Sequence, residues 1–546
     1  MKRRGEDFAD GYERVCFAAM LWGTQDQGRY VLEALMCGAH LQTYTNKDIR
    51  RIMYLCPDIA GYPGTKLLSL VWEVRMCEHL QTSTRMQRAT HNRLTNVWSK
   101  LQLVELLDPE FHLCVVIDTD TMATQSLNDL FFHHAPAAVW RGTRTVLQGK
   151  RRDARSYGTP PSGGKQVGGI NGGLVLMRPN RREFQEMLRH LETYEFTGKG
   201  AEQDFLTDFW RNRGGIATLP RKYNCQLHQV ALLGPEVPGD SVYWRMVTHH
   251  TEDVANWHFS ADPKPVDMVW GSIAFPASEA SSGSSSSAGP WLQANRAVLE
   301  AATTTTPPWR QTAGRAPNFI ERGPVREEYA APWRLEFTVE VLQAEMAKRS
   351  SKWRVGDIDE DRREEIKRVM VEATRMWIQS LHDTVWPNIV FMVSEEVRRR
   401  SLCGRNQQCL LCHHNNNVAG NNMEHNLFHC PLAFHAAEQI EYAVWKDMVS
   451  HPFTLQSGGK RIDQQLCYLG ALLQGWEEAA ALHVENVKPW TNDELCVAPT
   501  TKSNWENGLR DKTLQRQYHN QRRHAKRTRF DWWRHNGYED WRFRDA

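Results

Sequence analysis

Two aspartates one residue apart, Asp118 and Asp120, follow a run of apolar and β-branched residues at 113–117. Such a run predicts a buried strand, because a central strand of an α/β sheet is covered on both faces. Ligands bind at the carboxyl ends of strands in open α/β sheets. Both carboxylates are therefore expected to face one hard divalent cation, which can neutralise a diphosphate. Taken alone, the D-x-D tripeptide is more often a polar strand end that binds no metal.

The segments before the aspartates predict alternating strands and helices. Residues 14–21 and 48–55 have the composition of strands, and residues 30–41 between them carry apolar side chains at helical spacing. Residues 95–107 predict an amphipathic helix that leads into the strand at 113–117. Repeated strand–helix units of this kind predict an α/β nucleotide-binding domain.

The segments after the aspartates continue this pattern. Residues 172–177 predict a short strand, and residues 182–194 and 201–210 predict two amphipathic helices. Residues 141–169 between them are rich in Gly, Arg and Pro, which indicates a loop.

Five sequence elements occur in an order that is typical of one enzyme family. They are Lys100, Asp118-x-Asp120, Asn171-Gly172-Gly173, Ala201-Glu202-Gln203-Asp204-Phe205, and His258 with Lys264 six residues later. With them, residues 14–270 resemble a family 8 glycosyltransferase, the retaining GT-A group that includes glycogenin and plant galactinol synthase. The AEQDFL string at 201–206 is closest to the galactinol synthase form, and the His-to-Lys spacing is the glycogenin form.

The resemblance implies a GT-A fold, which is Rossmann-like with a mixed sheet, and a metal-dependent retaining hexosyltransferase activity. The donor would be a UDP-sugar, and the acceptor would be a sugar, a polyol or a protein. Asp118, Asp120 and His258 match the three metal ligands of the family, with manganese or magnesium as the ion. Carboxylate oxygens and an imidazole suit manganese.

The resemblance also implies three donor-binding residues. Lys264 would contact the diphosphate oxygens as a point charge, Lys100 would bind the donor, and Tyr30 lies where the family has a uridine-stacking tyrosine. Without the resemblance, Lys264 would be interpreted as a solvated loop lysine, and Lys100 as a solvent-facing helix residue.

Catalytic roles fall on Asn171, Glu202, Gln203 and Lys264 by the same resemblance. Asn171 and the two glycines after it would approach the sugar hydroxyls, whereas Glu202 and Gln203 would lie near the anomeric carbon. A simple turn at Asn171 and helix N-terminal capping by Glu202 are the structural alternatives.

Retention of configuration leaves two routes open, a covalent glycosyl-enzyme or a front-face substitution, and we favour the second because no residue is an evident nucleophile. The chain departs from the family at Asp26-Gln27, where glycogenin has Thr-Asn, in the loop at 141–169, and at Lys199, near an expected acidic residue. These departures bear on donor and acceptor identity.

The second half of the chain has a different composition. Residues 276–325 form a Ser/Thr/Pro-rich segment that we expect to be a disordered linker after a first domain at 1–275. Residues 326–481 predict a mostly helical second domain, and residues 482–546 a basic tail rich in Trp and Arg. Because of the linker, the first domain is expected to fold independently of the second.

Four of the twelve cysteines lie between positions 403 and 430. Cys409, Cys412, His425 and Cys430 have the spacing of a structural zinc site with Cys3His ligands. This segment, near 403–435, resembles the short zinc-binding segment of non-LTR reverse transcriptases, but no polymerase motif accompanies it. Alternative ligands are Cys403, His413, His414 and His429, and an unligated polar loop is the other interpretation.

Nucleic acid is a second candidate partner. Residues 502–546 contain 12 Lys and Arg against six Asp and Glu, with tryptophans between them, which is a pattern that binds RNA by phosphate contact and stacking. A solvated tail that docks on its own protein is the interpretation we favour, because the segment contains no recognisable RNA-binding motif. The alternative function is thus a nucleic-acid-associated fusion with an inactive transferase domain.

Localisation is expected to be cytoplasmic. The first twenty residues contain no continuous apolar stretch of the kind found in secretory signals, and no run of 18 apolar residues predicts a membrane span. The other eight cysteines are scattered singly rather than arranged as a disulfide framework.

Overall fold

The computed structural model describes most of the two predicted domains. The described residues are 14–81, 96–140, 169–194, 201–211, 213–226, 240–260, 264–270, 360–403, 408–409, 427–428, 433, 436–437, 440–451, 453–456 and 458–481. The loop at 141–168, the predicted linker at 276–325 and the tail at 482–546 lie outside them. The predicted domain boundaries at 275, 326 and 481 therefore stay predictions.

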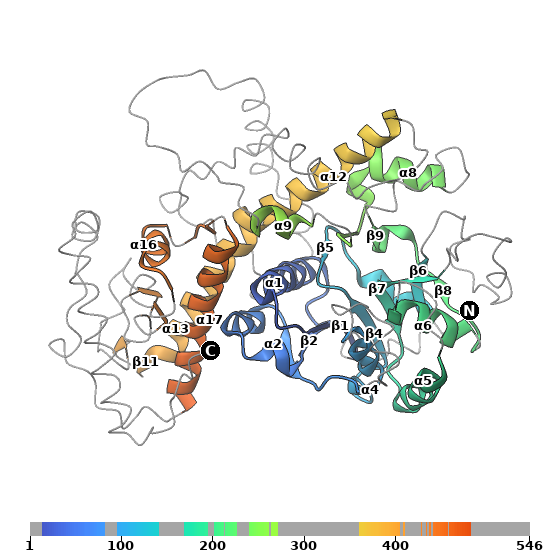
Figure 1. Cartoon of the computed structure of the whole chain (residues 1–546), viewed down its shortest axis with the longest axis horizontal. Helices are drawn as coiled ribbons and strands as arrows, with labels where there is room; N and C mark the ends of the chain where they lie inside the picture. Colours follow the sequence, from blue (N-terminus) through green and yellow to red (C-terminus); the bar gives the residue numbers. More distant parts are fainter. Residues whose placement is uncertain are drawn as a thin grey trace.

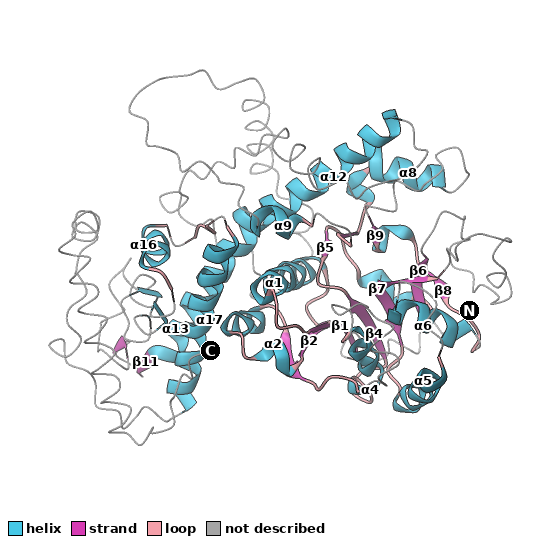
Figure 2. Cartoon of the chain, in the orientation of Figure 1, coloured by secondary structure: helices cyan, strands magenta, loops and turns pink. Residues whose placement is uncertain are grey.

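A seven-stranded mixed sheet forms the centre of the first part of the molecule (Figures 1 and 2). Its strands are β1 (Val15–Leu21), β2 (Arg50–Leu55), β3 (Glu73–Met76), β4 (Leu113–Ile117), β6 (Ala137–Trp140), β7 (Ile170–Met177) and β8 (Ala217–Thr218). Their order is β3-β2-β1-β4-β7-β6-β8, with β1 to β4 parallel and β7 antiparallel between β4 and β6. The sheet is mixed and is covered by helices on both faces, so the predicted α/β class with a mixed sheet is confirmed.

Side chains of the central strands alternate between two apolar cores, one on each face of the sheet. In β1, Val15 and Phe17 belong to the first core, whereas Cys16 and Ala18 belong to the second. All seven residues of β1 are buried. Continuous burial on both faces is what produces the unbroken apolar runs in the sequence of these strands.

Helices cover both faces of this sheet. The first face carries α1 (Gln27–Tyr44), η1 (Pro63–Leu70), η4 (Asn128–Phe132) and α9 (Pro265–Trp270). The second face carries η3 (Val97–Gln102), α4 (Leu103–Leu106), α5 (Arg181–Thr193) and α6 (Ala201–Arg211). Shorter connecting elements are α2 (Pro57–Ala60), η6 (Arg221–Tyr223), α8 (Asp240–His249) and η7 (Thr251–Asp253).

The helix predicted over residues 95–107 is two shorter elements, the 3-10 helix η3 and one turn of α-helix in α4. Trp98, Leu101, Val104 and Leu107 are all buried in the second core. Val97 and Leu103 are buried there as well, so this segment turns a broad apolar surface toward the second core.

A second, three-stranded sheet extends directly from the first. It has the order β5-β10-β9, formed by β5 (Thr121–Ala123), β10 (Asn256–His258) and β9 (Cys225–Gln226). Because β5 begins three residues after Asp118, the D-x-D turn is the junction between the two sheets.

The second part of the molecule is helical, as predicted. It consists of α12 (Glu360–Ser380), the π-helical η11 (Leu381–Val385), α13 (Trp386–Ser401), α16 (Tyr442–Ser450) and α17 (Gly459–Ala481), with short strands β11 (Leu402–Cys403) and β12 (Gln408–Cys409). In Figure 1, α12 runs above α1 and the central sheet, and α8 and α9 lie beside it.

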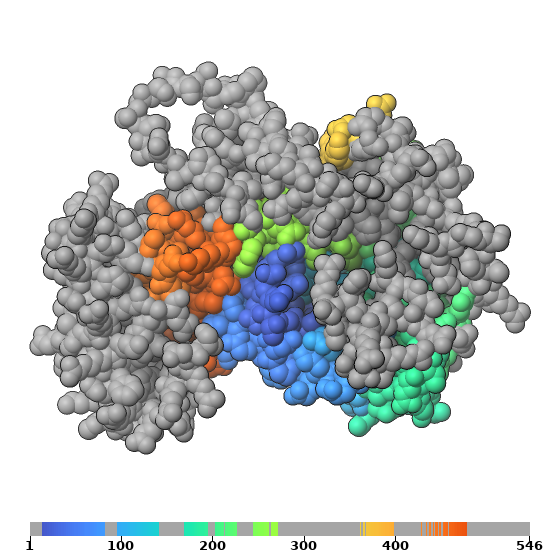
Figure 3. Space-filling view, viewed as in Figure 1, coloured from blue at the N-terminus to red at the C-terminus, as the bar shows by residue number. Residues whose placement is uncertain are grey.

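These helices share a core with the first part of the chain, a contact that the sequence pattern does not predict. One continuous cluster of buried residues contains Leu35 of α1 and Leu68 of η1 together with Trp386 of α13 and Leu469 of α17. Figure 3 shows the orange residues of the last helices directly against the blue residues of the first part. The sequence pattern misses this contact because both α1 and α17 carry apolar side chains around most of their surface.

Polar contacts also join the two parts. The His40 ring on α1 has its Nε2 atom 2.8 Å from Ser380 Oγ on α12, and the Tyr62 hydroxyl donates to Asp463 Oδ1 on α17 at 2.8 Å. At Gly470, an added Cβ would lie 2.0 Å from the Pro63 carbonyl oxygen, so α17 approaches η1 backbone to backbone. None of the described helices is long and apolar enough to cross a membrane.

Candidate metal centre

Two carboxylates and one imidazole meet at the junction of the two sheets. Asp118 follows β4 and Asp120 precedes β5, while His258 is the last residue of β10. Antiparallel pairing of β10 with β5 places His258 opposite Thr121, and the Phe259 N–H donates to the Asp120 carbonyl oxygen at 2.9 Å. The backbone register thus brings a histidine from late in the chain next to the D-x-D turn.

The donor atoms of this cluster lie close together. His258 Nε2 is 3.3 Å from Asp120 Oδ1 and 3.9 Å from Asp118 Oδ2, and one donor atom of each residue lies within 4.8 Å of the other two. The His258 side chain is 3% exposed, whereas that of Asp118 is 34% exposed. The cluster is therefore closed on the histidine side and accessible at Asp118.

A chain of amides sets the orientation of the His258 ring. Gly173 N–H and Asn224 Nδ2 both donate to Asn171 Oδ1, at 2.9 and 2.7 Å. Because Asn224 donates through Nδ2, its Oδ1 accepts from His258 Nδ1 at 2.7 Å. The Nδ1 atom therefore carries a proton, and Nε2 is the ring nitrogen that faces the two carboxylates and can become a metal ligand. An N,O,O donor set with this tautomer fits a divalent cation such as manganese or magnesium.

Lysines flank the cluster on two sides. Lys100 Nζ on η3 lies 2.5 Å from Asp118 Oδ1 and 3.9 Å from Glu202 Oε1. Lys264 Nζ lies 2.7 Å from Asp120 Oδ2. Burial disfavours both ammonium ions, but the neighbouring carboxylates outweigh it and raise the pKa of each lysine above its usual value. Both side chains are therefore fixed positive charges at this edge of the sheet.

The Asp120 carboxylate stays ionised despite its burial. Burial opposes the charge, but Lys264 and His258 outweigh it and hold the pKa of Asp120 well below its usual range. A further buried acid on α1, Glu33, lies 3.8 Å from Lys264 Nζ. Burial raises the pKa of Glu33 to about 7, while Lys264 acts in the opposite direction.

Residues Asn171, Glu202 and Gln203 lie next to each other beside the cluster. Gln203 Oε1 accepts from the Gly172 N–H at 3.0 Å, and Asn171 Nδ2 lies 3.5 Å from the same oxygen. The Glu202 side chain is 11% exposed and faces Lys100. The start of α6 is thus tied to the start of β7, and the three predicted residues are brought together with the metal cluster.

Tyr30 occupies the first turn of α1 and is half-buried against the first core. It is one helical turn before Glu33, on the same face of α1. Its ring lies 4.0 Å from the position of a Cβ on Gly23, in the loop that follows β1. Tyr30 and Lys264 thus approach the carboxyl edge of the sheet from α1 and from the start of α9.

The predicted cysteine-rich zinc site falls almost entirely outside the described residues. Cys412, His425 and Cys430 lie outside them, and of Cys409 only the backbone is described, in β12. This zinc site stays a prediction.

Sequence analysis missed Asn224 and Glu33 as members of this site. Asn224 contacts the proposed metal site only through the His258 ring, 34 residues later in the chain. The pairing of strands β9 and β10, which brings the two residues together, involves only two and three residues and leaves no pattern in the sequence. Glu33 did leave a signal, because it is an acid within the apolar stretch at 31–41 that forms the buried part of α1.

No protein-family model matches this chain. Its sequence is similar to uncharacterized protein R707 of Acanthamoeba polyphaga mimivirus, at 25% identity over 240 residues that cover 42% of this chain and 78% of that protein.

Solved structures with a similar fold are named as glycosyltransferases. The apo structure of the bifunctional enzyme WbbM is 12% identical at a TM-score of 0.32, and the match covers 47% of each chain. Galactosyltransferase LgtC, in complex with donor and acceptor sugar analogs, is 14% identical at 0.29, over 46% of this chain and 88% of LgtC. Mouse xyloside xylosyltransferase 1 is 16% identical at 0.27, over 45% of this chain and 98% of the mouse protein.

This chain spans about half the length of WbbM. It also spans 56% of GlyE from Streptococcus pneumoniae, which is 13% identical at a TM-score of 0.28, over 47% of this chain. At such scores the similarities carry no conclusion about activity. The glycosyltransferase-like fold rests on the order and direction of the strands.

Proposed function

We propose that this protein is a metal-dependent retaining glycosyltransferase of family 8 that moves a hexose from a UDP-sugar to a sugar, polyol or protein acceptor. The observation that carries the proposal is the convergence of Asp118, Asp120 and His258 at the carboxyl end of β4, with Lys100 and Lys264 on either side. Two acids, one imidazole and two ammonium groups at one sheet edge suit a diphosphate held on a cation.

Asp118, Asp120 and His258 would hold manganese or magnesium. When bound, the ion neutralises negative charge on the diphosphate leaving group. The role of Asn224 is to keep the His258 proton on Nδ1, so that Nε2 is available as a ligand. Most of this set is buried, which strengthens each charge interaction within it.

The lysines would stabilise the charge that develops as the glycosidic bond breaks. Lys264 Nζ, 2.7 Å from Asp120, would contact diphosphate oxygens bound next to that carboxylate. Lys100, buried beside Asp118 and Glu202, would contact the donor from the opposite side. Tyr30 would stack on the uracil ring at the start of α1.

Front-face substitution is the route that the arrangement of Glu202 and Gln203 favours. Glu202 faces the Lys100 ammonium, which lowers the nucleophilicity of its carboxylate. Gln203 is an amide whose Oε1 already accepts from Gly172 N–H. Neither side chain is thus prepared to form a covalent glycosyl-enzyme, and the leaving phosphate would take the proton of the acceptor. Asn171 and Gln203 would orient the sugar hydroxyls.

The test is binding of UDP to the full chain by calorimetry, with manganese and with excess chelator, followed by hydrolysis of a panel of UDP-hexoses. We expect binding that depends on the metal, and slow release of UDP from at least one UDP-hexose. Equal binding in chelator, or no hydrolysis of any UDP-hexose in manganese, would overturn the proposal.

Association with nucleic acid has no support among the described residues. Most of the cysteine-rich segment and all of the basic tail that suggested it lie outside them. The helical part packs on the first domain through an apolar surface.

A further inference from the structure

A second group of metal-binding side chains lies on the same sheet, at the ends of β2 and β3. The sequence Cys56-x-Asp58 follows β2, and the sequence Cys77-x-His79 follows β3. Each pair consists of a cysteine and a second metal-binding residue two positions later. Nothing in the proposed transferase chemistry uses these four residues.

The sheet register brings the two pairs together. Strands β2 and β3 are parallel neighbours with Leu55 opposite Met76, so Cys56 and Cys77 follow at equivalent positions. The Cys77 N–H donates to the Leu55 carbonyl oxygen at 3.0 Å, which continues the ladder by one residue. Both cysteines therefore end adjacent strands side by side.

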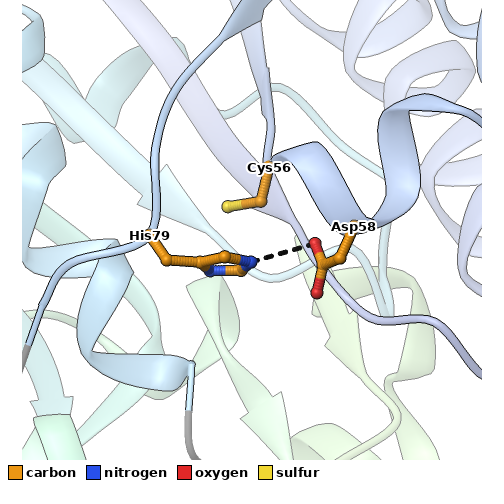
Figure 4. Close-up of side chains that lie close together, drawn as sticks. All are labelled: Cys56, Asp58 and His79. Atoms are coloured by element: carbon orange, nitrogen blue, oxygen red, sulfur yellow. Dashed lines mark ion pairs between the residues drawn. The ribbon is translucent and has the colours of Figure 1, made fainter.

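The donor atoms are close to one another. Cys56 Sγ and Cys77 Sγ are 3.7 Å apart, and His79 Nε2 lies 3.1 Å from Asp58 Oδ1. One donor atom from each of Cys56, Asp58 and His79 lies within 4.8 Å of the other two. Figure 4 shows the Cys56 side chain above the His79 ring, and the ring edge turned toward the Asp58 carboxylate.

These separations approach the geometry of a tetrahedral zinc site. With Zn–S bonds of about 2.3 Å, two tetrahedral sulfur ligands lie about 3.8 Å apart, and a nitrogen and an oxygen ligand lie about 3.3 Å apart. The observed pairs, at 3.7 and 3.1 Å, are close to these values. Cys77 contacts the group through Cys56 and is not one of the three residues whose donor atoms lie within 4.8 Å of one another, so its side chain would have to turn to become the fourth ligand.

Both cysteine thiols of this site are buried. Cys56 is fully buried, and Cys77 is 8% exposed. Two neighbouring buried thiols make only a weak contact with each other, whereas thiolates and imidazole are preferred zinc ligands.

A second pair of cysteines shows what distinguishes this group. Cys16 and Cys114 are also buried in register on adjacent parallel strands, β1 and β4. That pair belongs to no group of three or more metal-binding side chains among the described residues. It therefore serves as an internal control for the behaviour of buried thiols in this sheet.

We propose that Cys56, Asp58, Cys77 and His79 bind a structural zinc ion, separate from the manganese or magnesium site at Asp118. Thiolate and imidazole ligands favour zinc, whereas the Asp118 site is dominated by oxygen.

This zinc ion would fix the loop that leads into α1. Asp58 Oδ2 accepts from the Gly23 N–H at 2.9 Å, and the Asp58 carbonyl oxygen accepts from Gln27 Nε2 at 2.8 Å. Gly23 and Gln27 bracket the turn that precedes Tyr30. Metal bound at Asp58 would thus stabilise the segment that places Tyr30, without contacting the reacting atoms.

The test is the zinc content of the full chain, measured by elemental analysis after purification without chelator, in a Cys412→Ser background that disables the predicted C-terminal site. Cys77→Ala and His79→Ala should each lower the content by about one equivalent per chain. Cys114→Ala should leave it unchanged. Zinc affinity is measured by competition with a chromophoric chelator. Loss of a residue that only supports a metal ligand typically costs about 10- to 100-fold in affinity, and we expect each of the two variants, Cys77→Ala and His79→Ala, to lose more than that.

His79→Ala is the decisive variant, because it removes a partly exposed side chain, whereas loss of a buried cysteine could unfold the sheet edge. Equal zinc content in this variant and in the parent would overturn the proposal. A Cys56–Cys77 disulfide in zinc-free protein purified under air would overturn it as well. Asp120→Asn should retain this zinc, so failure of the transferase proposal and failure of the zinc proposal are distinguishable.

Discussion

At the scale of single residues, the candidate site combines carboxylates and ammonium groups of opposite charge with one histidine ring. An amide side chain, that of Asn224, holds this ring in position. Asp120 is buried, yet it stays ionised because Lys264 and His258 outweigh the cost of burial. The imidazole is aimed by Asn224, which takes its own orientation from Asn171. Each member therefore depends on a neighbour that never touches the proposed ion.

Asp120→Asn should abolish metal-dependent release of UDP from a UDP-sugar, because it removes one charged oxygen ligand while preserving the size of the side chain. We expect a loss of more than about 100-fold in turnover, since loss of an outer-shell partner alone costs up to that much. Steady-state hydrolysis with manganese measures it. Asp129→Asn, an exposed carboxylate on η4, is the control and should keep wild-type turnover. Wild-type activity of Asp120→Asn would contradict the assignment.

Asn224→Ala should weaken manganese binding without removing a ligand. The variant loses the acceptor that holds the His258 proton on Nδ1, so we expect a 10- to 100-fold rise, approximately, in the manganese concentration for half-maximal activity. Because Asn224 is a positioning residue, saturating manganese should restore most of kcat. A fall in kcat that manganese does not rescue would indicate a purely structural role.

The metal ligands could be predicted from the sequence, and the residues that orient them could not. Asp118, Asp120 and His258 belong to motifs with recognisable spacing, and the structure brings them together. Asn224 has no motif, because its position is set by pairing of the two-residue strand β9 with β10. Contacts that arise from such short strands leave no periodicity in the sequence.

At the scale of elements, the site depends on close packing between β7 and β10. A Cβ at Gly173 would lie 2.1 Å from His258 Cε1, so only glycine allows the histidine to reach the carboxylates. The Gly173 carbonyl oxygen also accepts from the Asp118 N–H at 2.9 Å, which anchors the D-x-D turn to β7. The Asn-Gly-Gly motif is therefore a spacing device as well as a possible sugar contact.

Gly173→Ala should displace the His258 ring and reduce turnover by about 100-fold, because a shift of about 1 Å in a catalytic group can cost that much. Manganese affinity should fall in parallel, and hydrolysis assays at several manganese concentrations measure both. The control is Gly61→Ala, where an added Cβ would meet nothing within 4 Å. Equal activity of the two variants would show that the ring can move aside.

The sequence predicts the strands of the central sheet better than the helices around them. Residues 113–117 form β4 as expected, because a fully buried strand must be continuously apolar. The segment at 95–107 predicts one α-helix, yet residues 97–102 form a 3-10 helix and only residues 103–106 form an α-helical turn. A short amphipathic pattern does not distinguish between these two helices until the partner surface is known.

At the scale of the whole molecule, the helical part belongs to the same core as the GT-A domain. The Ser/Thr/Pro-rich composition at 276–325 separates two segments of different composition, but it gives no information on whether those two segments pack against each other. Docking depends on the shape of apolar surfaces that are distant in sequence, such as the close approach of Gly470 to Pro63.

A fragment of residues 1–275 is expected to be poorly soluble, because it exposes the faces of α1 and η1 that α17 covers. Size-exclusion chromatography and binding of a hydrophobic dye, compared with the full chain, would measure this. Coexpression with residues 326–481 as a separate chain should restore a soluble complex. A monomeric, fully folded fragment would show that the shared core is dispensable for the first part.

Stability of the whole molecule should fall on mild acidification. Burial lowers the pKa of both His40 and His382 to about 4, whereas the ordinary value is 6.5. Between these values the unfolded chain binds more protons, so stability present above pH 6.5 is lost as pH falls toward 4. Each histidine should cost about 2 kcal/mol between pH 7 and pH 5.

Urea denaturation at these two pH values measures the loss, and His40→Gln should remove the part that belongs to His40. His133→Gln, at the end of η4, is a control that retains both buried histidines. The same pH dependence in wild type and His40→Gln would contradict the prediction.

The shared core has a consequence for synthesis of the chain. Helix α17 begins at Gly459, roughly 190 residues after α9 ends at Trp270. Helix η1 ends at Leu70, so about 390 residues separate it from the start of α17. At ribosomal rates of about 5–20 residues per second, the apolar faces of α1 and η1 leave the exit tunnel roughly 20–80 s before α17 is made. During that interval the nascent GT-A domain presents a surface that other chains can occupy. Yield of soluble protein should therefore depend on chaperones that bind nascent chains, and on expression temperature.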